Sequence, residues 1–137
     1  LEIIKYKTSI GIEYFLSYIT KKSGLSPEAL AKGDKIAGFL RLSLPKKSQS
    51  KKNFMKEIKN SAMIREVHVY GQAVGIGQKQ KGKAQHLGLG TKLIGLAQNL
   101  AKKSGYNKLA VISAIGTREY YRRRGFMKNN MYLSKDL

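Results

Sequence analysis

The feature that most constrains this chain is a glycine-containing loop that runs directly into an amphipathic helix. The loop is Gln85–Thr91, with the sequence Gln-His-Leu-Gly-Leu-Gly-Thr, and the expected helix covers residues 92–103. Apolar residues recur in that helix at intervals of three and four and make one apolar stripe: Leu93, Ile94, Leu96, Ala97, Leu100 and Ala101. We expect the helix to end at Ser104 and Gly105, because glycine is favoured just beyond a helix C-terminus.

This loop brings unpaired backbone N–H groups to the start of the helix. The first N–H groups of a helix have no partners inside it, and the helix dipole adds partial positive charge there. Gly88 and Gly90 lack Cβ atoms, so a phosphate can approach the main chain closely. The spacing matches neither the dinucleotide pattern G-x-G-x-x-G nor the G-K-[ST] of a Walker A loop. We therefore expect a pyrophosphate at this loop, and the alternative is a glycine turn before an ordinary surface helix.

Length and composition restrict the class of protein. The 137 residues, 42% of them hydrophobic, suit one compact domain that covers residues 1–137. The absence of cysteine excludes disulfides, thiolate metal sites and iron–sulfur clusters within the chain, and two histidines argue against a zinc site. No apolar run approaches the roughly 18 residues of a membrane span, so we expect no membrane partner.

The net charge of +19, from 27 basic and 8 acidic residues, is the strongest compositional signal. Such a charge attracts polyanions, of which nucleic acid is the leading candidate, whereas the alternative is a surface of solvated lysines. Residues 46–59 alone carry six lysines. This segment is expected to be a mobile, solvated loop, or else an arm that contacts phosphates.

The rest of the chain reads as alternating strands and helices. Apolar and β-branched segments predict strands over residues 2–6, 13–19, 35–44, 62–71 and 108–113, followed by a helix over 117–124 and a last hairpin or edge strand up to 135. Thr117 is the expected N-cap of the second helix, and Gly125 its end. The order strand, glycine loop, helix, strand implies that the two strands around the main helix are parallel neighbours.

The predicted strand over residues 62–71 has ionisable side chains on one face. Side chains alternate along a strand, so Glu66, His68 and Tyr70 share a face, while Arg65, Val67 and Val69 share the other. Burying a glutamate and a histidine without partners is costly. They are therefore either functional or located at a solvated strand edge.

Several motifs resemble those of one superfamily. The Q-x-x-G-x-G spacing resembles the acyl-CoA loop of the GNAT acetyltransferases, and Tyr-Arg-Arg-Arg-Gly-Phe at 121–126 resembles the motif with which many members close their site. A more specific match comes from four segments: Arg65–Gly71, Gln85–Gly90, Ala110–Ser113 and Gly116–Arg122. Together they resemble the C-terminal acetyltransferase-like domain of the Elongator catalytic subunit family, which modifies the wobble uridine of tRNA. The resemblance is good over residues 62–137 and implies an α/β GNAT fold, a mixed twisted sheet with helices on both faces.

The resemblance also implies a cofactor and the residues that hold it. Acetyl-CoA would lie with its pantetheine arm on the main chain of Glu66, Val67, His68 and Val69. Its pyrophosphate would lie on the loop, at Gly88, Leu89, Gly90 and Thr91, with Gln85 and His86 shaping the entrance.

Acyl transfer or thioester hydrolysis needs an acid and a base. Tyr121 or Tyr120 is the candidate acid that protonates the departing sulfur. Adjacent residues of a helix cannot face the same way, so we expect one tyrosine to line the site and the other to pack against the protein. We favour Tyr121 as the acid. Glu66 or His68 is the candidate base, or either could merely orient the strand. The resemblance further places a group of arginines beside the mouth of the site, where they would contact tRNA: Arg118, Arg122, Arg123 and Arg124.

The family implies further partners that this chain does not contain. Its members carry a radical S-adenosylmethionine domain with a cysteine-bound iron–sulfur cluster, so the expected partners are tRNA, that domain of the same polypeptide and other Elongator subunits, in the cytoplasm. The expected function is to supply or hydrolyse acetyl-CoA for carboxymethyluridine formation, with the isolated domain only partly active. The alternatives are a protein (histone) lysine acetyltransferase, which the charge of +19 opposes, and a non-catalytic tRNA-binding module.

Overall fold

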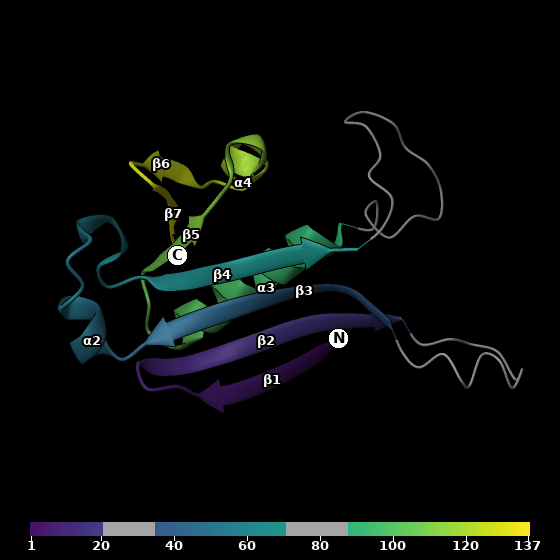
Figure 1. Ribbon diagram of the computed structural model, residues 1–137, viewed down its shortest axis with the longest axis horizontal. Helices are drawn as coiled ribbons and strands as arrows, with labels where there is room; N and C mark the ends of the chain where they lie inside the picture. The colour runs from purple at the N-terminus through teal and green to yellow at the C-terminus, as the bar shows by residue number, and fades with distance from the viewer. Residues whose placement is uncertain (21–34, 71–87) are drawn as a thin grey trace, which may run out of the picture.

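The strands of the chain form one mixed sheet. A computed structural model describes residues 1–20, 35–70 and 88–137, and within them the sheet order is β1-β2-β3-β4-β5-β7-β6 (Figure 1). The strand bounds are β1 Glu2–Lys7, β2 Gly11–Thr20, β3 Lys35–Pro45, β4 Ala62–Val69, β5 Lys108–Ile112, β6 Met127–Asn129 and β7 Tyr132–Asp136. All neighbours are antiparallel except β4 and β5, which are parallel, as the sequence order predicted.

The helices differ in length and in how well they were predicted. They are α2 Lys47–Lys51, α3 Leu89–Lys103 and α4 Arg118–Arg122, with single 3-10 turns at Lys56–Ile58 and Ile115–Thr117. The lysine-rich segment 46–59 therefore contains short helical turns, and the expectation of an unstructured loop was wrong there. No helix in the described part of the chain is long and apolar enough to cross a membrane.

The ends of α3 are both set by glycines in the left-handed region. Gly88 precedes the helix with a φ of 64°. At the other end Gly105 has a φ of 79°, its N–H donates to the Lys102 carbonyl (3.0 Å), and the Tyr106 N–H donates to the Ala101 carbonyl (3.1 Å). This pair of bonds is a Schellman motif, and it confirms the predicted stop at Ser104 and Gly105.

The core lies between α3 and one face of the sheet. Buried side chains of α3 pack against β2, β3, β4 and β5, and the fully buried members of the core include Leu16, Leu40, Leu42, Ile64 and Leu93. Each buried Leu or Ile contributes about 1.5–3 kcal/mol.

Two irregularities of β4 shape the region above the core. Its pairing with β5 covers only Ala62–Ile64, after which the two strands separate. Its register with β3 shifts, since Leu42 pairs with Ile64 and Arg41 with Glu66, so Arg65 is an extra residue in a β-bulge. The bulge puts Ile64 and Val67 on the same face. The expectation that Arg65 shares a face with Val67 in a regular alternation was therefore wrong.

Candidate functional site

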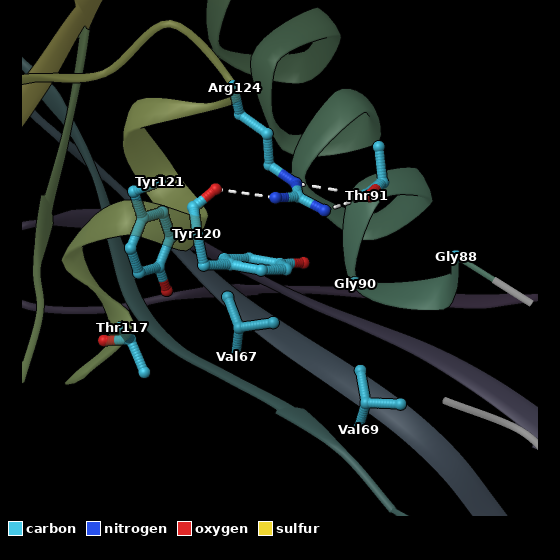
Figure 2. Close-up of a pocket in the computed structure, with 9 residues that line it drawn as sticks. All are labelled: Val67, Val69, Gly88, Gly90, Thr91, Thr117, Tyr120, Tyr121 and Arg124. Carbon is cyan, nitrogen blue, oxygen red and sulfur yellow. Dashed lines mark hydrogen bonds between the residues drawn. The ribbon is translucent and has the colours of Figure 1, made fainter. Parts of the chain in front are cut away.

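A pocket forms where β4 separates from β5 and α3 begins. It has a volume of about 330 Å³, at the lower end of the range for small-molecule sites. Strand β4 contributes Val67 and Val69, the start of α3 contributes Gly88, Gly90 and Thr91, and the α4 region contributes Thr117, Tyr120, Tyr121 and Arg124 (Figure 2). The pocket thus joins three segments that the sequence analysis had linked to one site.

The α3 end of the pocket presents unpaired main-chain donors. No side chain caps the start of this helix. Its first backbone hydrogen bond runs from the Lys92 N–H to the Gly88 carbonyl (3.0 Å). The preceding N–H groups, at Leu89, Gly90 and Thr91, have no intrahelical acceptors. Such a helix start suits an anion.

Gly90 makes a close contact with Tyr120. A Cβ atom added at Gly90 would collide with the hydroxyl oxygen of Tyr120, so a larger residue at this position would displace the phenol ring. The phenol therefore lies directly on the main chain at the start of α3.

The two adjacent tyrosines point in different directions, as expected, but both line the pocket. In Figure 2 the Tyr120 hydroxyl points to Gly90, whereas the Tyr121 hydroxyl points into the space between Thr117 and Val67. Their rings meet edge to face, with centroids 5.4 Å apart. The expectation that one of the two would only pack is not met, although Tyr121 is the more buried and also packs against Phe126.

The environment of Tyr121 keeps its phenol protonated. Burial raises the pKa of Tyr121 above its ordinary value of 10.0, the neighbouring Tyr120 raises it further, and the positive charge of Arg124 opposes both. At neutral pH this side chain is a hydrogen-bond donor and a proton source.

Arg124 joins α4 to α3. Its guanidinium lies 3.4 Å from the centre of the Tyr120 ring, and two of its nitrogens donate to the Thr91 hydroxyl at 2.6 and 3.2 Å (Figure 2). A third nitrogen donates to the Tyr120 carbonyl at 2.6 Å. The side chain predicted to contact nucleic acid is therefore part of the pocket wall.

The other three arginines of α4 and its end do not line the pocket. Arg122 and Arg123 are exposed and pair with Glu119, at 4.0 and 3.2 Å. Arg118 is half-buried at the start of α4. All three remain candidates for an outer, nucleic-acid-facing surface.

Glu66 and His68 lie on the opposite face of β4 from the pocket. Glu66 pairs with Arg41 at 2.9 Å and contacts the His68 ring at 3.5 Å. The His68 ring also stacks on Phe39, with centroids 4.9 Å apart. The structure does not bring either side chain to Tyr121, so a base at these positions would have to act through the opening between β4 and β5.

Three further positions from the sequence predictions remain. Gln85 and His86 lie outside the described residues. Thr117 is at the N-cap position of α4, as predicted, but its hydroxyl caps no N–H of the helix; it donates to the Ala114 carbonyl (3.0 Å), and the residue also lines the pocket. The sequence does contain a signal for the roles of Thr117 and Arg124 in the pocket. Each is four residues from a tyrosine, Thr117 from Tyr121 and Arg124 from Tyr120, and residues at this spacing are neighbours on a helix.

Comparisons with known proteins show the family to which the chain belongs. No family model matches the chain. Elongator complex protein 3 of Dictyostelium discoideum is 38% identical over 141 aligned positions, which cover all of this chain and 23% of that protein. The tRNA uridine(34) acetyltransferase of Methanocaldococcus jannaschii is 38% identical over 136 positions, which cover 97% of this chain and 22% of that protein.

Solved structures show the same family and fold. The archaeal Elp3 of Methanocaldococcus infernus superposes with a TM-score of 0.75 and 33% identity, covering 99% of this chain and 29% of that one. An acetyltransferase of Bacillus cereus, 15% identical, has the same fold, with a TM-score of 0.54 over 91% of this chain and 74% of that one. The chain spans about a quarter of the length of the curated relatives that it matches. It has the GNAT fold and belongs to the family of Elongator complex protein 3 and the tRNA uridine(34) acetyltransferases, whose C-terminal region it matches.

Proposed function

We propose that this chain is the acyl-CoA-binding domain of a tRNA wobble-uridine modifying enzyme, and that acetyl-CoA binds in the pocket of Figure 2. When bound, acetyl-CoA supplies a two-carbon acyl group activated as a thioester. The wider enzyme transfers that unit toward C5 of uridine 34 in tRNA, in the formation of carboxymethyluridine. The names of the relatives, tRNA uridine(34) acetyltransferase and Elongator complex protein 3, support this choice of substrate.

The observation that carries the proposal is the arrangement of two unlike ends in one pocket. One end holds the uncapped N–H groups of α3 beside Gly88 and Gly90, which suit a pyrophosphate. The other end holds the Tyr121 hydroxyl near Thr117. Between them the main chain of β4 at Val67 and Val69 is exposed by the separation from β5, so it is available to hold the amides of a pantetheine arm.

Tyr121 has the properties of the general acid. A phenol is protonated at neutral pH, and burial raises the pKa of Tyr121 further, so its hydroxyl can donate a proton or a hydrogen bond to a thiolate as that group departs. Tyr120 is less suited, because its hydroxyl lies against Gly90 at the phosphate end.

Arg124 adds a fixed positive charge to the phosphate end. Its three hydrogen bonds and its stacking on Tyr120 hold the guanidinium beside the first turn of α3. A diphosphate on the α3 amides would meet this cation, in addition to the helix dipole. Leu89 and Thr91 complete the proposed phosphate loop, together with Gln85 outside the described residues.

The remaining partners follow from the family. They are tRNA, a radical S-adenosylmethionine domain of the same polypeptide with its iron–sulfur cluster, and other Elongator subunits. A net charge of +19 favours tRNA over the basic tails that a histone acetyltransferase would have to bind.

Calorimetric titration of the chain with acetyl-CoA tests the proposal, together with thioester hydrolysis measured with and without tRNA. We expect micromolar binding and hydrolysis that depends on tRNA and on Tyr121. Binding of tRNA with no affinity for acetyl-CoA would reject the acyl-transfer function in favour of a non-catalytic RNA-binding module. Acetylation of lysine peptides in preference to any effect of tRNA would identify a protein acetyltransferase.

A further inference from the structure

A second pocket lies at the other end of α3, where no known or proposed function of the chain is located. Its volume is about 540 Å³, well within the range of ligand sites. In Figure 1, α2 lies at the end of the sheet where β4 begins, away from the start of α3. A helix of 15 residues is about 22 Å long, so the two pockets are separate sites.

This second pocket is lined by lysines from several elements. Lys47 and Lys51 come from α2, Lys59 follows the 3-10 turn, and Lys108 opens β5. One carboxylate, Asp136, lies at its rim. None of the ion pairs found in the described parts of the chain involves these four lysines. Lys108 donates from its Nζ to the Glu57 carbonyl at 3.4 Å, whereas Lys47, Lys51 and Lys59 are exposed.

The negative end of the α3 dipole does not cancel this charge. The last carbonyls of α3 already accept hydrogen bonds from Ser104, Gly105 and Tyr106. The turn also brings Lys47 close, since its Nζ atom lies 3.8 Å from where a Cβ on Gly105 would be. The last carbonyls of α3 are thus satisfied by backbone N–H groups, and Lys47 adds a positive charge beside the helix end.

The polar side chains that complete the lining are two asparagines, Asn60 and Asn107. A side-chain amide carries an NH2 group, so each of them can donate to an anion. Ser50 also belongs to the lining, but it is only 4% exposed and its Oγ is shielded from solvent. Ser50 is therefore part of the pocket wall and not a donor to a ligand.

We propose that this second pocket binds a phosphate group. Lys47, Lys51 and Lys59 would neutralise its charge from different directions, which suits a tetrahedral anion better than a planar carboxylate. The side-chain amides of Asn60 and Asn107 can donate to its oxygens. The phosphate is either a phosphodiester of bound tRNA, a source that rests on the proposed function, or a free phosphate.

The first test separates this pocket from general charge. The variant Lys47→Gln/Lys51→Gln loses two pocket lysines, whereas the control Lys102→Gln/Lys103→Gln loses the same charge from exposed positions of α3 outside both pockets. Fluorescence anisotropy with a tRNA transcript should show affinity about tenfold weaker for the pocket variant, with a salt dependence reduced by about one to two units of slope, and a change of less than about twofold for the control.

Inorganic phosphate identifies the source. At matched ionic strength, phosphate should raise the melting temperature of the wild-type chain relative to chloride, but not that of Lys47→Gln/Lys51→Gln. An effect of phosphate without any difference between the two double variants toward tRNA identifies a free phosphate as the ligand. If phosphate is without effect and both double variants weaken tRNA binding equally, the proposal is overturned. Acetyl-CoA titration of the same variants reports separately on the first pocket, which they should leave unchanged.

Discussion

The two ends of α3 carry pockets of positive potential that are built in different ways. At the start of the helix the potential comes from main-chain N–H groups, and one charged side chain, Arg124, supplements them. At its end the main-chain groups are capped, and the potential comes from lysine side chains. A site made of backbone depends on glycines and on local φ angles, and it holds a ligand in one position. A site made of lysines tolerates substitution and depends on ionic strength.

The largest effect is expected on the rate of thioester cleavage in the pocket at the start of α3, which we call the backbone-built pocket. Tyr121→Phe removes the only phenol whose hydroxyl points to the Thr117 end of that pocket in the described structure. We expect the rate of thioester cleavage to fall about 100-fold while acetyl-CoA affinity stays within about twofold, as is usual for loss of a general acid. Stopped-flow or steady-state kinetics with acetyl-CoA and tRNA measures this. Tyr120→Phe is the matched variant, and a loss confined to Tyr120→Phe would exchange the roles of the two residues.

A smaller effect should distinguish the two glycines of the same helix region. Gly88 has a φ of 64°, so Gly88→Ala forces a side chain into the left-handed region, at a cost of about 1–2 kcal/mol. Gly95→Ala lies within α3 with no atom near the added Cβ, and it should stabilise by about 0.5–1 kcal/mol. Thermal unfolding measures both changes, and calorimetry should show weaker acetyl-CoA binding only for Gly88→Ala. Equal stabilisation by both variants would show that the φ at position 88 is not required.

The fold could be predicted from the sequence where local residues determine it, and not where distant segments do. The helix α3, its glycine stop and the strands around it were predictable, because local periodicity and glycine chemistry determine them. The bulge at Arg65 was not, since it depends on the register with β3, a partner distant in the chain. This register decides that Val67 and Val69, rather than Glu66 and His68, face the pocket.

The second pocket was the least predictable part of the molecule. Its helix α2 is lysine, serine and glutamine throughout, so it has no apolar stripe by which to recognise it. Charge alone suggested phosphate contacts in this segment, but not that Ser50 would be buried or that Lys108 would lie beside it. Side chains brought together only by the fold leave no local pattern in the sequence.

Arg124 can be assigned to one of two roles by substitution. If it belongs to the backbone-built pocket, Arg124→Gln loses the stacking on Tyr120 and the bonds to Thr91, and acetyl-CoA affinity should fall about fivefold, or ~1 kcal/mol. Its effect on tRNA affinity should then equal that of Arg122→Gln, an exposed neighbour of the same charge. A selective loss of tRNA affinity in Arg124→Gln would instead return this residue to the nucleic-acid surface.

The smallest expected effect compares one tyrosine from each pocket in alkaline solution. Burial raises the pKa of both Tyr121 and Tyr106 above 10.0, so the folded state holds each proton more tightly than the unfolded state does. Below pH 10 both states are protonated and stability is unaffected. Above pH 10 the unfolded chain ionises first, so the free energy of unfolding falls until the folded pKa is passed. Chemical denaturation at a series of alkaline pH values should therefore give a shallower decline in the free energy of unfolding for Tyr121→Phe and for Tyr106→Phe than for the wild-type chain.

Tyr106→Phe also loses the hydrogen bond from the Tyr106 hydroxyl to the Pro45 carbonyl. It should therefore be less stable at every pH, and only the slope of its stability against pH is informative. An unchanged slope in Tyr121→Phe would mean that this phenol ionises equally in both states, and it would contradict the raised pKa of Tyr121 in the folded chain.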